Sequence, residues 1–290
     1  KAIRDEYDPH GGRAIGSREM LDIREAEYGG EMLYINKSAR HPMWAMEYSR
    51  DEGLRKYWDE YSYPYHKEGA GPLYRGKDAS DYNHNQDILA VENIRRWFDY
   101  WQERPGTGTR ISSGGVKIIF SDTNTHFRGE ENYRRSGVTD AMRIPKDAFY
   151  THQVMWDGWV DIEQPRIHII GHWNYKEDVI KPVYVVSGAD KVELFLNGKS
   201  LGEGEREYHF LYTFKDVQFE TGKLEAIGYD ETGKECCRTE LQTAGKPEEI
   251  RLTCVQSPDG WKADGADMVL LQVEVMDKHG RRCPLANDCL

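Results

Sequence analysis

The pattern of apolar residues changes near residue 165, and this change constrains the fold more than any other feature of the chain. Before it, runs typical of strands alternate with runs typical of helices, an order that predicts parallel β/α units. After Pro165 the helical periodicity disappears and short apolar runs follow one another. We therefore expect an α/β part followed by an all-β part.

In the α/β part, apolar residues recur at spacings of three and four over 87–101, which predicts an amphipathic helix. Strands are expected over 42–47 and 114–120, with a short one over 13–17. Three strands cannot close a barrel that needs eight. We therefore expect part of a (β/α)8 TIM barrel that the remainder of the same polypeptide completes, with a small open α/β domain as the alternative.

In the all-β part, strands are expected over 182–186, 191–196 and 224–229, and Asn197-Gly198 predicts a two-residue hairpin turn. A further module is expected from about residue 246, with strands over 250–255 and 268–276. A strand followed by Asp-x-x-Gly and a basic residue occurs in both segments.

This shared pattern fits two immunoglobulin-like β-sandwich domains in tandem, the second incomplete because it has about 45 residues against the roughly 100 of such a domain. The expected domains are 1–164, 165–245 and 246–290.

Composition narrows the classes of partner. A net charge of −11 over 290 residues argues against a protein that binds nucleic acid or a membrane surface. No run approaches the 18 apolar residues of a transmembrane helix. The five cysteines match no zinc pattern, so free thiols are expected, with a Cys283–Cys289 bridge as the alternative.

Glu47 ends the apolar run that begins after His41. In a barrel of parallel strands, the C-terminal strand ends form the active-site face. A carboxylate there, followed by Tyr48, is well placed for chemistry on a sugar. The alternative is a structural Glu that caps the strand or pairs with an Arg.

Several blocks of the chain, taken in order, resemble the later part of a family 2 glycoside hydrolase, the β-galactosidase and β-glucuronidase group. They are Tyr7 to Pro9, Pro42 to Tyr48, Ser136 to Asp140, Arg143 to Tyr150 and Val192 to Gly202. The resemblance implies that residues 1–164 are the C-terminal part of the TIM-barrel catalytic domain, at about barrel strands six to eight.

The resemblance implies a retaining mechanism, in which two carboxyl groups about 5–5.5 Å apart flank the scissile bond. Glu47 would be the nucleophile, with a donor such as Arg18 holding its pKa low. The family's acid/base is a Glu after an Asn at the end of strand four. The chain contains no Asn-Glu dipeptide, so this residue is expected upstream of Lys1.

The expected substrate is a terminal β-galactoside of an oligo- or polysaccharide. The alternatives are a β-glucuronide or an anionic galactan bearing sulfate or uronate, and, from another class, a non-catalytic carbohydrate-binding or structural segment. Where the family commonly has a Tyr after strand six and a Trp after strand eight, this chain has Arg18-Glu19 and Ser121-Asp122.

The loop after the last predicted barrel strand is rich in Arg, His and Asn, which suit recognition of hydroxyls or anions. Arg18, Asp122, His126 and Arg128 are the expected substrate-binding residues, the alternative for the loop being a solvated segment joined by its own salt bridges. His168 and His172 lie in a run expected to be a strand, where a spacing of four is a poor metal clamp, so packing roles are expected.

No organic cofactor is expected. Some members of the family use Mg²⁺ or Na⁺ near the site, but the sequence assigns no ligand set. The expected partner is a carbohydrate substrate, and homo-oligomer formation stays open. A periplasmic or secreted location is expected, with the cytoplasm as the alternative.

Overall fold

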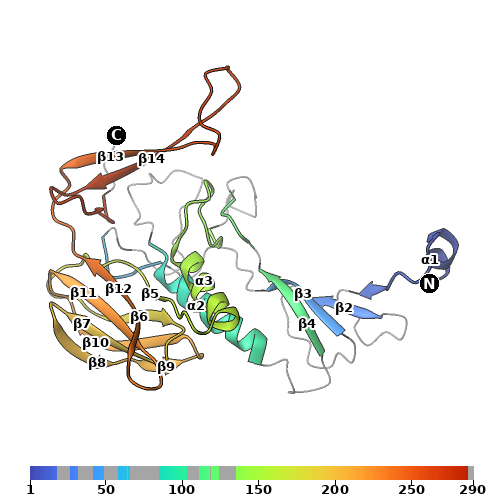
Figure 1. The fold of residues 1–290 in the computed structure, drawn as a ribbon, viewed down its shortest axis with the longest axis horizontal. Helices are drawn as coiled ribbons and strands as arrows, with labels where there is room; N and C mark the ends of the chain where they lie inside the picture. The colour runs from blue at the N-terminus through green and yellow to red at the C-terminus, as the bar shows by residue number, and fades with distance from the viewer. Residues whose placement is uncertain are drawn as a thin grey trace.

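The computed structural model describes residues 1–17, 27–31, 42–48, 58–63, 65, 85–102, 111–117, 119–123 and 135–286. In strands β2 and β3, and in β4 as far as residue 116, the description covers the backbone. An α/β part leads into a β-rich part, with helices α2 and α3 between the parallel strands and the sandwich (Figure 1).

The α/β part contains a parallel sheet whose strand order is β1-β2-β3-β4. The short helix α1 (Ala2–Tyr7) precedes it, and the strands are β1 (Gly16–Ser17), β2 (Tyr28–Glu31), β3 (Pro42–Tyr48) and β4 (Ile111–Lys117). Because β3 and β4 are parallel, the chain has to cross between them, and helix α2 (Asp87–Gln102) forms part of this crossing.

Two expectations are corrected here, and one strand was missed. Strand β4 begins and ends three residues earlier than the predicted 114–120, because Lys117 is its last paired residue. The strand expected over 13–17 is reduced to its last two residues. Strand β2 was not expected at all, since Tyr28-Gly29-Gly30-Glu31 lacks the apolar run that marks a buried strand.

Helix α2 agrees with the predicted amphipathic helix to within one residue. Its buried face includes Val91 and Ile94, which share a core with Met155 of helix α3 (Asp147–Val160). Phe210 and Leu211 of the following domain belong to the same core. The two helices therefore bury their apolar faces against the β-rich part.

Two four-stranded antiparallel sheets form the β-sandwich, with strand orders β5-β6-β10-β9 and β12-β11-β7-β8. The strands are β5 (Ile167–Ile169), β6 (Ile180–Ser187), β7 (Lys191–Leu196), β8 (Lys199–Glu203), β9 (Glu205–Glu207), β10 (Leu211–Gln218), β11 (Lys223–Tyr229) and β12 (Glu235–Gln242). Alternate residues of β7 point inward, and Leu194 contributes to a core with Trp173 and Tyr212. The predicted hairpin turn is confirmed: Asn197 and Gly198 both have positive φ, 52° and 80°.

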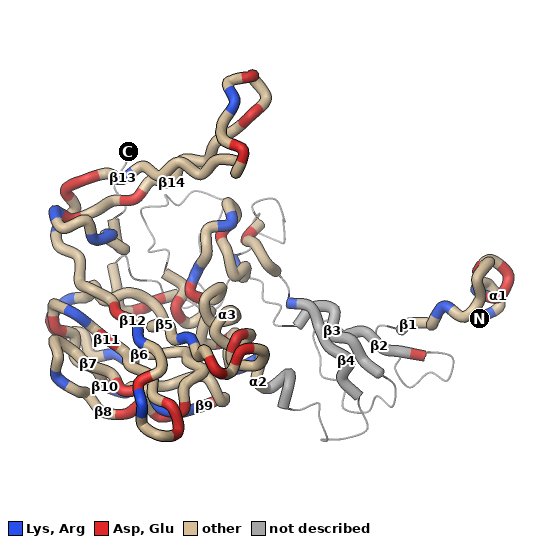
Figure 2. Tube along the Cα trace, in the orientation of Figure 1, with Lys and Arg blue, Asp and Glu red and all other residues tan. Residues whose placement is uncertain are grey.

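The last described element is an antiparallel hairpin of β13 (Glu249–Val255) and β14 (Leu270–Met276). Both strands were predicted, and the Asp-x-x-Gly turns after β11 and β14 place Gly233 and Gly280 at positive φ. Acidic and basic residues are interspersed over the sandwich and hairpin (Figure 2), and ion pairs such as Arg251–Glu274 join neighbouring strands.

The mixed α/β and β composition and the sandwich arrangement agree with the expected fold class. Barrel closure, the immunoglobulin-like class and the boundaries 1–164, 165–245 and 246–290 stay predictions. Among the described residues, no helix is both long and apolar enough to cross a membrane.

Candidate functional site

Glu47 lies where the pairing between β3 and β4 is irregular. Ala45 pairs with Gly115 and Tyr48 pairs with Lys117, so three steps along β3 match two steps along β4. The extra residue is Met46 or Glu47, which makes a bulge near the C-terminal end of β3. Bulges are frequent at barrel rims and beside active sites because they redirect a side chain.

Of the other predicted site residues, Arg18, His126 and Arg128 lie outside the described residues. Their substrate-binding roles stay predictions, as does the expected action of Arg18 on the pKa of Glu47. The backbone of Glu47 is described, and only Asp122 has a described side chain.

Asp122 is buried, and its carboxylate is engaged by groups of the chain itself. Oδ1 accepts hydrogen bonds from the Gly137 amide at 2.9 Å and from Lys146 Nζ at 3.0 Å. Arg135 Nη1 lies 3.9 Å from Oδ2. Burial raises the pKa of Asp122 and lowers that of Lys146, so each charge depends on the other. This arrangement fixes the segment after β4, and a contact of Asp122 with substrate stays a prediction.

A second buried polar group joins the segment 58–63 to the sandwich. Asp59 accepts hydrogen bonds from the Tyr61 amide at 2.9 Å and from the Ser62 hydroxyl. Its Oδ2 lies 2.9 Å from His172 Nε2. Burial acts to raise the pKa of Asp59, but the His172 hydrogen bond, the Lys181 charge and the Ser62 hydroxyl together lower it to about 2.

Lys181 extends this group towards helix α2. Its ammonium donates a hydrogen bond to the Tyr175 hydroxyl at 2.9 Å and lies 3.6 Å from Asp87 Oδ2 at the start of the helix. Burial raises the pKa of Asp87 to about 7, against the opposing effect of the Lys181 charge. The Lys181 ammonium therefore acts on two carboxylates, of which Asp59 has a pKa below the ordinary 3.8 of an Asp and Asp87 has a pKa above it.

The sequence singled out His168 and His172 but gave no sign of their partners. His168 Nε2 lies 2.7 Å from Asp147 Oδ1 at the start of α3, whereas His172 contacts Asp59. The two rings thus engage different carboxylates and share no ligand position. In the part of the chain that the structure describes, no cluster of His, Cys, Asp and Glu could hold a metal ion.

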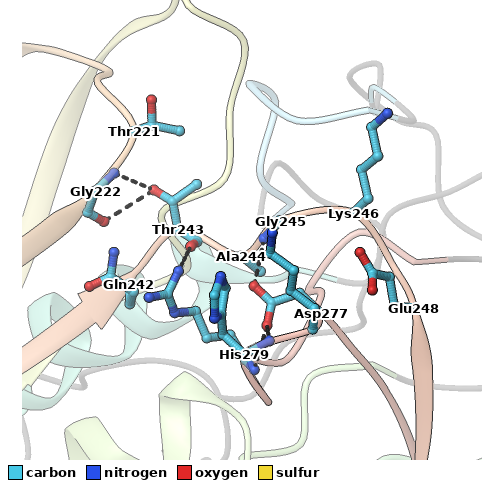
Figure 3. A pocket seen from close by; sticks show the side chains of 12 residues that line it. Thr221, Gly222, Gln242, Thr243, Ala244, Gly245, Lys246, Glu248, Asp277 and His279 are labelled. Carbon is cyan, nitrogen blue, oxygen red and sulfur yellow. Dashed lines mark hydrogen bonds between the residues drawn. The ribbon is translucent and has the colours of Figure 1, made fainter.

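A cavity of about 490 Å³ lies where the sandwich meets the β13–β14 hairpin (Figure 3). Gln242, Thr243, Lys246, Asp277 and Arg281 are among the residues that line it. Asp277 Oδ2 accepts a hydrogen bond from the Gly245 amide at 2.8 Å, and Arg281 donates one to the Thr243 carbonyl at 3.3 Å. No Trp, Tyr or Phe belongs to the described lining, so the described lining lacks the large aromatic side chains that commonly stack on sugars. These hydrogen bonds connect the end of the sandwich to the turn after β14, so they indicate that the residues around the cavity join the sandwich to the hairpin.

Comparison with known proteins gives a family model described as "Domain of unknown function (DUF4982)" that matches residues 178–237, within the sandwich. Over 97% of its length, the chain is 34% identical to a beta-glucuronidase of Formosa agariphila and covers 28% of that protein. Over 52% of its length, it is 37% identical to the beta-galactosidase BoGH2A of Bacteroides ovatus and covers 17% of that protein.

Among solved structures, a beta-glucuronidase from glycoside hydrolase family 2 matches 98% of the chain with a TM-score of 0.72 and 31% identity. The chain covers 29% of that structure. The match therefore spans the parallel sheet, helices α2 and α3, the sandwich and the hairpin within one larger polypeptide.

Proposed function

Since the chain belongs to glycoside hydrolase family 2, we propose that it is part of a retaining β-glycosidase and that Glu47 is the catalytic nucleophile. The observation that carries this proposal is the position of Glu47 in the bulge near the C-terminal end of a strand in a parallel sheet. A carboxylate at that edge can attack the anomeric carbon of a bound sugar.

In the proposed reaction, ionised Glu47 displaces the leaving group and forms a glycosyl-enzyme. A second carboxyl group, contributed by the remainder of the polypeptide, protonates the leaving oxygen. It then deprotonates the water that hydrolyses the intermediate. We propose that the reaction uses no organic cofactor, because formation and hydrolysis of the glycosyl-enzyme consist of displacements and proton transfers that carboxyl groups can perform.

For the substrate, we propose a terminal β-glucuronide ahead of the β-galactoside expected from the sequence. The Formosa agariphila relative named beta-glucuronidase aligns with 97% of the chain, whereas two relatives named beta-galactosidase align with 52% and 57%. A uronate needs a cationic partner, and Arg18 and Arg128 are our candidates for it.

The test uses the full-length protein with matched β-glucuronide and β-galactoside substrates. We expect Glu47→Gln to lower kcat by roughly 10³-fold or more, the scale on which loss of a nucleophile acts. A fluorosugar that traps the glycosyl-enzyme should label Glu47 in the wild type and fail to label Glu47→Gln. Glu249→Gln, the same chemical change on an exposed strand, is the control and should keep wild-type activity.

Rescue separates a nucleophile from a carboxylate that supports folding. Azide should restore turnover of Glu47→Gly, because the small anion can attack from the vacated position and yield a glycosyl azide of inverted configuration. Sugar binding without labelling would instead support a non-catalytic carbohydrate-binding segment.

A further inference from the structure

Two His–Asp pairs cross from the sandwich to the α/β part, and they reach different elements. His168, in β5, contacts Asp147 at the start of helix α3. His172, just beyond β5, contacts Asp59 in the segment 58–63. The first pair therefore attaches a helix, whereas the second attaches the connection between β3 and α2.

The second pair is the centre of a cluster that we call the Asp59 clamp: Asp59, Tyr61, Ser62, His172 and Lys181. The side chains of Asp59, His172 and Lys181 are each less than a tenth exposed. Lys181 Nζ lies 5.5 Å from the centre of the Tyr61 ring. The sandwich thus contacts the segment 58–63 at two side chains of that segment, the Asp59 carboxylate and the Tyr61 ring.

The tautomer of His172 follows from its two contacts. Nδ1 accepts a hydrogen bond from the Asn174 amide at 3.1 Å, so the proton of a neutral ring is on Nε2 and is donated to Asp59. The ring also stacks on Tyr175 with centroids 4.5 Å apart. His172 is therefore held in one orientation from the sandwich side.

These contacts exclude a Ser-His-Asp nucleophilic triad. In such a triad, the two ring nitrogens serve the Ser and the Asp separately. Here Ser62 and Asp59 both lie at Nε2 of His172, and the Ser62 hydroxyl donates to Asp59 itself. The cluster can hold a segment in place but cannot activate Ser62.

The location of the segment gives the clamp its significance. The chain leaves β3 directly after Glu47-Tyr48, passes through 58–63 and enters α2 at Asp87. Since β3 and β4 are parallel, the connection from β3 to α2 starts from the edge of the sheet where Glu47 lies. Lys181 lies beside Tyr61, within this connection, and beside Asp87, where helix α2 begins.

We propose that His172 and Lys181 are positioning residues for the glycosidase: through the Asp59 clamp the sandwich fixes residues 58–63, which follow Glu47 along the chain, and thereby supports substrate binding beside Glu47. This inference rests on the proposed function. The His168–Asp147 pair, in contrast, serves docking of the sandwich alone.

The test compares His172→Leu with His168→Leu in the full-length protein, because each variant removes one His–Asp pair at the same domain boundary. We expect His172→Leu to lower kcat/KM by about 10-fold to 10²-fold, the cost of a small misplacement away from the reacting atoms. KM should rise more than kcat falls, since a loosened connection has to be ordered when substrate binds. His168→Leu should lower Tm and leave both constants within about two-fold of wild type.

His172→Gln retains an N–H that can reach Asp59 and should restore most of the lost kcat/KM. If His172→Leu does not fold, Ser62→Ala removes a donor to Asp59 from within the segment and is measured in its place. Equal kinetic losses in the His172 and His168 variants, or unchanged kinetics in a folded His172→Leu, would overturn the proposal.

A second readout does not depend on activity. Amide hydrogen exchange over 58–63 should be about ten-fold faster in His172→Leu than in wild type and unchanged in His168→Leu. If the wild-type enzyme hydrolyses no glycoside, the proposed function fails and the positioning role with it. The clamp is then still decided by exchange: faster exchange supports it, and unchanged exchange excludes it.

Discussion

At the scale of single residues, Gly137 shows how closely the segment after β4 is packed. A Cβ atom at this position would lie 2.4 Å from the Asp122 amide nitrogen and 2.7 Å from the Thr139 carbonyl oxygen. Both contacts are with backbone atoms, which cannot move away as a flexible side chain can. Any side chain at this position therefore requires the neighbouring backbone to shift.

We predict that Gly137→Ala destabilises this segment by about 1–3 kcal/mol, the usual cost of overpacking. The matched control is Gly188→Ala, whose Cβ would meet Pro165 Cβ at an ordinary 3.4 Å. Hydrogen exchange of the Asp122 and Thr139 amides measures the effect, since both are hydrogen-bonded across the segment. Equal protection in the two variants would contradict the prediction.

A candidate site residue could be predicted from the sequence where a local pattern indicates its role. Glu47 was singled out because a carboxylate interrupts an apolar run, and the structure adds the bulge that surrounds it. The pairing of His172 with Asp59 could not be predicted, because the two residues are 113 positions apart. Nothing local indicates which carboxylate a buried His will meet.

At the scale of elements, the alternating pattern of β7 places Leu194 at the centre of the sandwich core, where it is fully buried. We predict that Leu194→Ala costs about 2–5 kcal/mol, the range for loss of a large core side chain with the cavity it leaves. Leu201 on β8 is 39% exposed, and Leu201→Ala should cost about 0.5 kcal/mol or less.

Hydrogen exchange of the amides in β7 and β11 reports this difference, because the two strands are paired throughout. Protection should fall in both strands together for Leu194→Ala, as expected of one cooperative unit. Loss of protection confined to β7 would mean that the two strands do not unfold as a unit.

Helix α2 and strands β6, β7 and β11 could be predicted because periodicity and turn residues agree there. Strand β4 is displaced because its first half, Ile111 to Gly114, carries Ser and Gly in place of an apolar run. That half is specified by pairing with β3, a tertiary effect that overrides local propensity. The sequence pattern also did not show that α2 and α3 pack against the sandwich.

At the scale of the whole molecule, Asp277 decides how the hairpin is attached to the sandwich. Its buried carboxylate accepts hydrogen bonds from the amides of Gly245, His279 and Arg281. The first of these lies in the connection between the two units, and the other two lie in the turn of Asp277 itself. These bonds, led by that from Gly245, lower the pKa of Asp277 from the ordinary 3.8 to about 2.

Because the pKa is lower in the folded protein, the ionised carboxylate stabilises the joint above pH 3.8, and this stabilisation is lost as the pH falls towards 2. We predict that Asp277→Asn loosens the joint at pH 7 and that its difference from wild type shrinks between pH 4 and pH 2. Exchange of the Gly245 amide and proteolysis within 243–248 measure the joint directly.

The control is Asp230→Asn. The Asp230 carboxylate accepts hydrogen bonds from the Thr232 and Lys234 amides in the equivalent turn after β11. Its bonds stay within that turn, so this substitution should loosen the turn but leave Gly245 protected. A joint that opens equally in both variants would mean that the hairpin is held by contacts other than the Asp277 carboxylate.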